Sequence, residues 1–506
     1  MNVEYIIVQA GGKGTRLNGF TRNKPKCLVP VNNLPILFHL FRQFPQKKFI
    51  IIGDYRYEVL EKYLEVFAEV SCRMVRAGKE GNCAGISGAL KFVPDNTPFM
   101  LIWSDLILAP AITIDGIPEF NYLGISKDFE CRWSFNGSTF EEKPSREYGV
   151  AGMFIFQNKK LLAETPESGE FVNFLSGGAV EFKCLGLEGT REIGGLTAYN
   201  NQGNTECRCR PFNRLEISGD TIMKIPIDAQ GEKLAEREIA WYREVRKYKF
   251  EMIPEILSWE PFTMRRIRGC NIYRAKLDDA GKKTVIDNLV AALESLHSLK
   301  SIEKDILSIR EAYYTKTIAR LEKVRGLIPF ADQETIIINN KPCRNIFFYK
   351  NEFSGMVERL LYNASFAFIH GDCTFSNLMT DDNLRVIFLD PRGYFGFTEL
   401  YGDTAYDWAK VFYSLNGDYD QFNNGNFTLG IGDKAITLEI APNGWKHLSD
   451  YYLAKIPDCS PERIRFIHAV IWLSLTAYTW EDYDSICGAF YNGLLLMDEF
   501  LREYKP

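Results

Sequence analysis

A glycine-rich turn follows the first apolar stretch of the chain. Residues 5–8 have the composition of a buried strand, and they run into Gly11-Gly12-Lys13-Gly14-Thr15-Arg16-Leu17. A turn of this kind at the end of a first strand exposes backbone N–H groups that can surround a polyphosphate. Taken alone, the loop is equally compatible with a plain strand-to-helix turn.

Two common phosphate loops are excluded. A Walker A loop needs Ser or Thr after Gly-Lys, where this chain has Gly14, and a dinucleotide fingerprint needs glycine where Leu17 stands. The basic residues between positions 13 and 26, with no acid among them, suit a triphosphate and its pyrophosphate leaving group. They are Lys13, Arg16, Arg22, Lys24 and Lys26.

Length and charge narrow the function classes. A chain of 506 residues predicts two or three domains. Its net charge of −5 argues against nucleic acid as a partner, although small phosphorylated ligands need only a local basic pocket. The N-terminus lacks the pattern of a signal peptide, and no apolar window is long enough for a membrane span. The 12 cysteines match no common zinc pattern, so we expect reduced thiols and a cytoplasmic protein.

The first half alternates short apolar strands with helical patterns. Strands are predicted at residues 5–8, 49–52, 99–103 and 152–156, with helices at 36–44 and 55–67. This alternation predicts an α/β domain with a mostly parallel, mixed, doubly wound sheet. The polar stretch at 200–205 places the boundary there, giving domains 1–203 and 204–506.

The second half has a different order of elements. A hairpin is predicted over residues 215–224 with a Gly219-Asp220 turn, followed by helices at 232–247 and 283–299. Strands first and helices later predict an α+β domain with two lobes, at about 207–265 and 266–506.

The N-terminal motif resembles that of sugar-phosphate and phosphocholine nucleotidyltransferases. The resemblance rests on the run from Gly11 through Lys26 to Leu28-Val29-Pro30-Val31 and covers roughly residues 3–200. It implies that Arg16 and Lys26 bind the triphosphate. The nucleotide contacts that it implies around them are Gly11, Gly12, Lys13, Gly14 and Thr15.

Further motifs follow in the order that this family has. Asp105 ends a strand and would bind Mg²⁺, and the loop from Gly81 to Gly85 resembles the one that lies against the nucleobase. Lys143 would meet the acceptor phosphate. Glu192 stands where the family carries aspartate, which leaves its role as a second metal ligand open. The implied reaction is in-line attack of a phosphate oxygen on the α-phosphorus of a nucleoside triphosphate, with no protein nucleophile.

A second motif lies near the end of the chain. His370-Gly371-Asp372 is followed by Asn377 at the spacing that separates a kinase's catalytic Asp from its metal-binding Asn, and residues 385–389 form a strand that delivers Asp390. The stretch resembles aminoglycoside phosphotransferases and choline kinases. By that resemblance Asp372 would orient the substrate hydroxyl, while Asn377 and Asp390 would bind Mg²⁺.

The same resemblance assigns the remaining kinase positions. Lys224, on the hairpin, would hold the ATP phosphates, with Glu238 as its ion-pair partner and Glu236 as the alternative. Adenine would sit at residues 264–267. Asp403 and Asp407 would brace the catalytic loop.

Two features stay open at this level. Arg392, where protein kinases have Phe, would meet a phosphate or an anionic substrate, or would pair with a neighbouring carboxylate. An aromatic-rich tail suits either a cage for a quaternary ammonium or a well-filled helical core. Its residues are Trp408, Phe412, Tyr413, Tyr419, Trp472, Tyr478, Trp480 and Tyr483.

The two motifs together predict a bifunctional enzyme. A kinase would phosphorylate a small hydroxylated acceptor with ATP, and a nucleotidyltransferase would couple the phosphate to CTP or UTP, making an activated donor of the kind used for capsule polysaccharide. The alternatives are synthesis of CDP-choline, an antibiotic-resistance kinase with an unrelated partner, and a regulatory protein with one inactive domain. A homo-oligomer is compatible with the sequence, which does not identify the acceptor.

Overall fold

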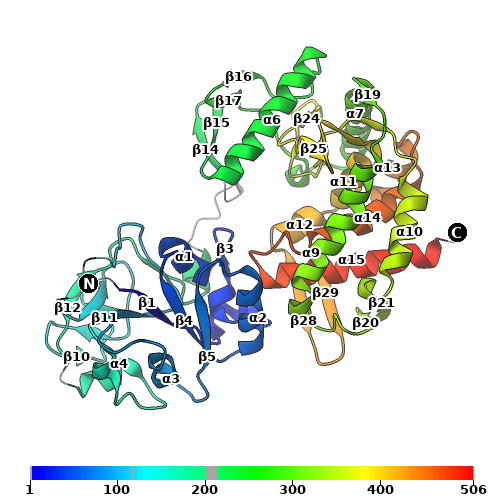
Figure 1. The fold of residues 1–506 in the computed structure, drawn as a ribbon. Helices are drawn as coiled ribbons and strands as arrows, with labels where there is room; N and C mark the ends of the chain where they lie inside the picture. The colour runs from blue at the N-terminus through cyan, green and yellow to red at the C-terminus, as the bar shows by residue number, and fades with distance from the viewer. Residues whose placement is uncertain (1–2, 115, 117–118, 179, 201–212, 505–506) are drawn as a thin grey trace. The chain divides into compact units, whose positions relative to one another are not determined.

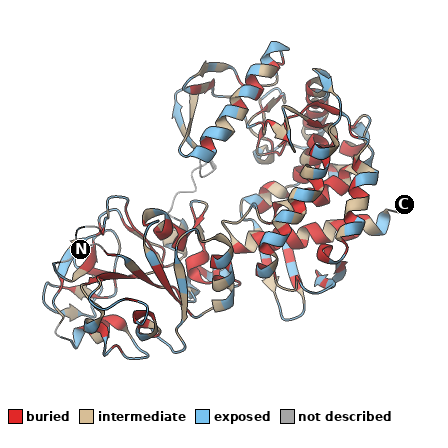
Figure 2. Ribbon diagram, viewed as in Figure 1, coloured by how far each residue is buried: buried red, intermediate tan, exposed pale blue. Residues whose placement is uncertain are grey.

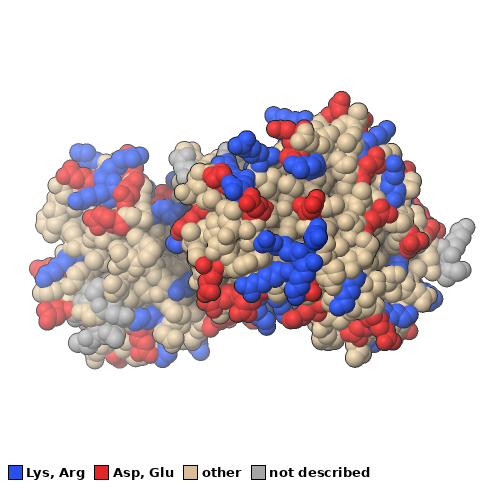
Figure 3. All heavy atoms as spheres, turned by 90° about the horizontal axis from the view of Figure 1, so that it is seen from above, with Lys and Arg blue, Asp and Glu red and all other residues tan. Residues whose placement is uncertain are grey.

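The computed structural model describes residues 3–114, 116, 119–178, 180–200 and 213–504. The chain forms two compact units: Met1–Cys207 with Trp480–Asp484, and Arg208–Thr479 with Ser485–Pro506. The expected domain boundary after residue 203 lies outside the described residues. Across the part of the chain that is described, no helix is both long and apolar enough to cross a membrane. Acidic and basic side chains are interspersed over the face seen in Figure 3.

Unit 1 is built on a mixed sheet. Its main path runs β10-β9-β11-β6-β1-β4-β5, and off this path β8 pairs with β11 and β12 pairs with β8. The predicted strands are confirmed as β1 (Tyr5–Gln9), β4 (Lys48–Gly53), β6 (Phe99–Trp103) and β11 (Gly149–Phe156). β1 pairs in parallel with β4 and β6, and β11 is antiparallel to β6.

The remaining strands and helices of unit 1 flank this centre (Figure 1). The predicted helices are confirmed as α1 (Ile36–Gln43) and α2 (Tyr57–Phe67). The other helices are α3 (Ile86–Leu90), α4 (Phe171–Ser176) and α5 (Leu196–Asn200). The other strands are β2 (Pro30–Val31), β3 (Leu34–Pro35), β5 (Cys72–Arg76), β7 (Leu106–Ile107), β8 (Tyr122–Ser126), β9 (Ser134–Phe135), β10 (Phe140–Glu141), β12 (Lys183–Gly186) and β13 (Arg191–Glu192).

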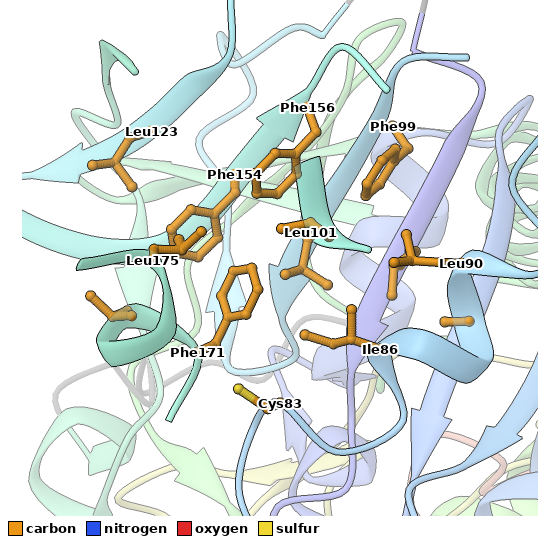
Figure 4. Packing of buried hydrophobic residues seen from close by; sticks show 14 of the residues in the cluster. Cys83, Ile86, Leu90, Phe99, Leu101, Leu123, Phe154, Phe156, Phe171 and Leu175 are labelled. Atoms are coloured by element: carbon orange, nitrogen blue, oxygen red, sulfur yellow. The ribbon is translucent and has the colours of Figure 1, made fainter. Parts of the chain in front are cut away.

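Aromatic and aliphatic side chains close one face of this sheet. Leu101 of β6 and Phe154 of β11 are fully buried, and Phe171 of α4 packs edge-on against Phe154 with ring centroids 5.3 Å apart (Figure 4). Ile86 of α3 belongs to the same cluster. The core therefore fixes β6 and β11, whose ends carry predicted site residues.

A short segment from far along the sequence completes unit 1. The indole of Trp480 packs against Phe38 of α1 and Phe67 of α2, at centroid distances of 5.6 and 5.7 Å. The Tyr63 hydroxyl donates a hydrogen bond to the Trp480 carbonyl. Residues 480–484 thus belong to unit 1, which the sequence did not indicate.

Unit 2 begins with an antiparallel sheet and one long helix. The sheet has the order β14 (Asn213–Ser218), β15 (Thr221–Pro226), β17 (Phe262–Arg265) and β16 (Ile256–Trp259). The predicted hairpin and its Gly219-Asp220 turn are confirmed as β14 and β15. The predicted helices are confirmed as α6 (Ala229–Lys247) and α7 (Asp279–Ser298).

Helices and small sheets make up the rest of unit 2. One antiparallel sheet has the order β18 (Cys270–Asn271), β23 (Leu378–Thr380) and β24 (Val386–Phe388). A second has the order β19 (Ser301–Ile302), β22 (Phe366–Phe368) and β27 (Tyr401–Asp403). A four-stranded sheet, which the sequence reading missed, comprises β21 (Lys341–Arg344), β20 (Thr335–Ile338), β29 (Ile436–Ile440) and β28 (Phe427–Ile431).

Two helices of unit 2 are buried along most of their length (Figure 2). They are α11 (Thr404–Leu415) and α14 (Pro461–Leu475), and Trp472 of α14 packs edge-on against Tyr413 of α11. The other helices are α8 (Ile306–Arg310), α9 (Lys316–Val324), α10 (Lys350–Leu361), α12 (Tyr419–Asn423), α13 (Ser449–Lys455) and α15 (Tyr483–Glu503), which belongs to unit 2 from Ser485 onward.

Candidate active sites

The strand order of unit 1 creates a switch point at β1. The chain runs from β1 outward to β4 and β5, and then returns to β6 on the other side of β1. In open α/β sheets, ligands bind outside the carboxyl ends of the strands at such a point. Gln9 and Trp103 are register partners at these ends, so the glycine-rich loop and Asp105 emerge side by side.

The loop is shaped around Gly14 and Lys26. Gly14 has φ of 65°, in the left-handed region, and a Cβ there would lie 2.9 Å from the Cβ of Lys26. Only glycine allows both that backbone and that approach. Gly11 and Gly12 precede this bend, and Lys13 and Thr15 beside it are exposed, so the loop presents backbone and cationic groups to solvent.

Charged groups of both signs meet next to this loop. The ammonium of Lys26 lies 2.6 Å from Oδ2 of Asp105, and both side chains are largely buried. The guanidinium of Arg16 lies 3.9 Å from Glu192. Burial raises the pKa of Glu192, and the neighbouring Asp105 carboxylate raises it further. Glu192, whose role the sequence left open, therefore shares a site with Asp105.

The loop expected at the nucleobase reaches the same end of β1. The side-chain amide of Gln9 donates to the carbonyl of Asn82 at 2.5 Å. Gly85 has φ of 80°, and a Cβ there would lie 2.5 Å from Ile52, so this turn also requires glycine. Lys143 is exposed on the connection between β10 and β11.

Lys24 does not take part in the exposed cationic surface. Its ammonium is buried and lies 2.7 Å from Asp482 and 2.5 Å from Asp484, while Asn23 donates to Asp484 at 2.9 Å. Burial lowers the pKa of Lys24, but the two carboxylates outweigh it and leave the pKa above its ordinary value. This lysine of the basic run is therefore a structural residue.

Unit 2 brings together predicted residues from a strand, a helix and the end of another strand. The ammonium of Lys224, on β15, lies 2.6 Å from Glu238 of α6 and 2.6 Å from Asp390, which follows β24. Glu236 is exposed, so Glu238 is the partner in this structure. Burial raises the pKa of Glu238 to about 7, the Lys224 ammonium opposes that rise, and Asp390 adds to it.

Asp372 and Asn377 form a second contact pair. The amide of Asn377 donates to Oδ2 of Asp372 at 2.9 Å, and the ammonium of Lys410 lies 3.0 Å from Oδ1. The N–H of Leu389 donates to the carbonyl of Asn377, which connects the residue just before β23 to the residue just before Asp390. Asp390 has φ of 50°, a conformation that residues other than glycine rarely adopt.

The two acids expected to brace this loop have separate contacts. Asp407 is fully buried and accepts hydrogen bonds from the N–H groups of His370 and Gly371, at 2.8 and 2.7 Å. Asp403 instead caps α11 and pairs with Arg463 at 2.8 Å. Only Asp407 directly holds the turn that precedes Asp372.

The aromatic tail supplies core rather than a cage. Within unit 2, Trp408, Phe412, Tyr413 and Trp472 are buried.

Arg392 contacts no carboxylate among the described residues. Its guanidinium donates to the hydroxyls of Tyr406 and Tyr394 at 3.0 and 3.2 Å.

Comparison with known proteins shows that part of the first unit is similar to a known domain family. The MobA-like NTP transferase domain matches residues 6–119. A UTP–glucose-1-phosphate uridylyltransferase of Haloferax volcanii is 33% identical over 107 residues, covering 20% of this chain and 43% of that protein. The D-glycero-alpha-D-manno-heptose 1-phosphate guanylyltransferase of Campylobacter jejuni is 31% identical over 88 residues, covering 17% of this chain and 39% of that protein.

The chain therefore spans less than half the length of these curated relatives. Among solved structures, HddC from Yersinia pseudotuberculosis is 18% identical with a TM-score of 0.34, covering 40% of this chain and 98% of that one. The matched residues include the loop after β1, Lys26 and Asp105. The chain contains an N-terminal nucleotidyltransferase domain of the MobA-like type.

Proposed function

We propose that the chain is a bifunctional enzyme acting in sequence. Unit 2 phosphorylates a small hydroxylated acceptor with ATP, and unit 1 couples the resulting phosphate ester to CTP or UTP. The products are an NDP-activated donor, suited to surface polysaccharide synthesis, and pyrophosphate. Fusion of the two activities is explained if the product of one is the substrate of the other.

The nucleotidyltransferase step relies on positioning and charge. The acceptor's phosphate oxygen attacks the α-phosphorus, and the bond to the bridging oxygen of the pyrophosphate breaks. Arg16, Lys26 and the backbone N–H groups of the β1 loop stabilise the charge that moves onto the leaving group. The relatives' names describe sugar 1-phosphates, which favours a sugar phosphate, or a phosphate ester like it, as the acceptor.

Both sites have donors that fit Mg²⁺. Oδ1 of Asp105 is buried and accepts no hydrogen bond from any described residue, and the Asp105 carboxylate is close enough to Glu192 to add to the rise in the pKa of Glu192 that burial causes. In unit 2, Asn377 and Asp390 supply the oxygen ligands that this hard cation prefers. Bound there, Mg²⁺ would neutralise phosphate charge and orient the triphosphate.

The kinase assignment is carried by one observation. Lys224 bridges Glu238 and Asp390 with two contacts of 2.6 Å, so a strand, a helix and a strand end meet at one ammonium. A kinase needs a lysine on the nucleotide phosphates, paired with a glutamate and placed near a metal-binding aspartate. Asp372, held by Asn377 and Lys410, then has the role of accepting the proton of the acceptor hydroxyl.

Reciprocal variants test the two halves separately. Lys26→Ala removes a charged contact to the triphosphate, and we expect pyrophosphate release from a ready-made sugar phosphate to fall about 100-fold or more, with ADP formation unchanged. Asp372→Asn should abolish ADP formation and leave that pyrophosphate release intact. Lys48→Ala, which breaks the exposed pair with Glu4 and the contact with the Tyr5 ring, is the matched control. Loss of both activities in either variant would contradict two independent sites.

A further inference from the structure

A small cavity in unit 2 is lined by three cationic side chains. Its volume is about 230 Å³, and Lys316, Arg320 and Arg392 face it together with Tyr394 and Tyr406. Lys316 and Arg320 are one helical turn apart on α9, so they share a face of that helix. Just before α9 the chain forms a π-helical turn, Glu311–Thr315, a distortion that often marks functional sites.

These cations lie over tyrosine rings but lack the carboxylate partners that buried charges normally have. Among the described residues, no carboxylate lies within ion-pair distance of Lys316, Arg320 or Arg392. Arg392 donates to two phenol hydroxyls, and Arg320 donates to the carbonyl and hydroxyl of Ser474 at 2.8 and 3.0 Å. Glu311 is the one acid of the lining.

The electrostatics show the cost of this arrangement. Burial lowers the pKa of Lys316 to about 6, and the charges of Arg392 and Arg320 contribute to the shift. Uncompensated positive charge in a partly buried site is unfavourable, and a bound anion would offset it. The cavity is therefore complementary to a negatively charged group.

The cavity lies beside Asp372. Tyr406, in its wall, is one turn before Lys410 on α11, and the Lys410 ammonium lies 3.0 Å from Asp372. The N–H of Arg392 donates to the carbonyl of His370, two residues before Asp372, at 2.8 Å. The cavity is thus linked to the turn that carries Asp372 through the backbone of Arg392 and through Lys410, and the Asp372 carboxylate is close enough to help raise the pKa of Arg392.

We propose that this cavity binds the acceptor of the kinase reaction and that the acceptor is an anion, a polyol carrying a carboxylate or a phosphate group. The inference rests on the proposed kinase function. Arg392, Lys316 and Arg320 hold the anionic group, which directs a hydroxyl toward Asp372. That hydroxyl oxygen forms a bond to the γ-phosphorus of ATP, its proton passes to Asp372, and ADP leaves with the bridging oxygen.

The same charge argues against a quaternary ammonium acceptor. A trimethylammonium group is stabilised by aromatic faces and is repelled by fixed cations. Here two arginines line the cavity beside Lys316, and the rings of Tyr394 and Tyr406 in its wall already lie against Arg392. The structure thus favours an anionic acceptor over choline.

A matched set of acceptors tests the proposal on the full chain. ADP formation is measured with glycerate, glycerol 3-phosphate, glycerol and choline, and with glucuronate, glucose 6-phosphate and glucose. We expect kcat/KM at least tenfold higher for an anionic member than for its neutral counterpart. Comparing the carboxylate acceptors with the phosphate acceptors shows which anionic group the cavity binds. A neutral or cationic acceptor used as well as the anionic ones would overturn the proposal and leave the kinase standing.

Two variants probe the cavity itself. Arg392→Gln removes charged hydrogen bonds, and we expect about 10- to 150-fold lower kcat/KM for the anionic acceptor, mainly through KM. Lys316→Met removes a cation that is unfavourable in the empty cavity, so it should raise Tm while it raises KM. The control is Lys350→Met, which breaks an exposed pair with Glu322. An unchanged KM in both cavity variants would overturn the proposal.

Binding without turnover separates this inference from the proposed function. The Asp372→Asn variant is titrated calorimetrically with the same acceptors, and the anionic acceptor that the wild type phosphorylates should bind. Adding Arg392→Gln to this variant should abolish the binding. If the wild-type chain binds the anions but phosphorylates no acceptor, the cavity is an anion-binding site only. The kinase function and the acceptor assignment that rests on it are then both wrong.

Discussion

Replacing Asp482 and Asp484 by asparagine should destabilise unit 1 strongly, although the two residues lie more than 450 positions from Lys24. The Lys24 side chain is 2% exposed and is held by both carboxylates. The double variant leaves a buried ammonium with no anion. Breaking a buried pair in this way costs about 3–5 kcal/mol. In a unit of about 200 residues, each kcal/mol shifts Tm by about 2–4 °C, so Tm should fall by about 6–20 °C.

The assay is differential scanning calorimetry of the full chain. The transition of unit 1 is identified as the one that Leu101→Ala lowers, because Leu101 is fully buried in the core of that unit. Lys48→Met breaks a pair of similar length, 2.6 Å, on an exposed surface, and should not change Tm measurably.

A third variant tests whether the loss of stability comes from the unpaired charge of Lys24 or from a general disturbance of residues 480–484. Adding Lys24→Met to the double variant removes the unpaired charge, and Tm should return most of the way to wild type. If the double variant unfolds within about 2 °C of wild type, Lys24 does not depend on these carboxylates and the account of residues 480–484 is wrong.

Three further predictions concern the sites. The kcat/KM for a carboxylate acceptor should fall as pH rises above about 6, because Lys316 loses its proton there, and Lys316→Met should remove this dependence. The charged groups that act on it are Glu311, Arg320, Arg392 and Lys410. Asp407→Asn loses an acceptor for the N–H of His370 or Gly371, and ADP formation should fall at least about tenfold with pyrophosphate release from a sugar phosphate unchanged. Gly85→Ala should lower both Tm and nucleotidyl transfer, because its φ is 80° and a Cβ meets Ile52, and an unaltered KM for nucleotide would contradict the placement of this loop.

Local pattern predicted much of unit 1 because its signals are short range. Strand composition located β1 and β6 within a residue, and the parallel register then brought the glycine loop beside Asp105. The contact between Lys26 and Asp105 follows from this topology. In unit 2 the hairpin turn and the spacing of Asp372 and Asn377 were equally readable, since both are local.

Contacts between distant segments could not be predicted in this way. Asp482 and Asp484 are two acids in a polar connection, which in sequence looks like a solvated turn, and nothing local links them to Lys24. Lys316 and Arg320 look like the charged face of a surface helix. Their meeting with Arg392 depends on tertiary packing, so the cationic cavity emerges only from the structure.

The most direct test of the sequential reaction follows one phosphate through both steps. The full chain is incubated with an anionic acceptor, ATP labelled at the γ-phosphate and unlabelled CTP or UTP. The account predicts one labelled phosphate in each molecule of NDP-activated donor, none in pyrophosphate, and no labelled donor with Asp372→Asn. An NDP-linked product without label, or a labelled phosphate ester that CTP and UTP leave unconsumed, would contradict it.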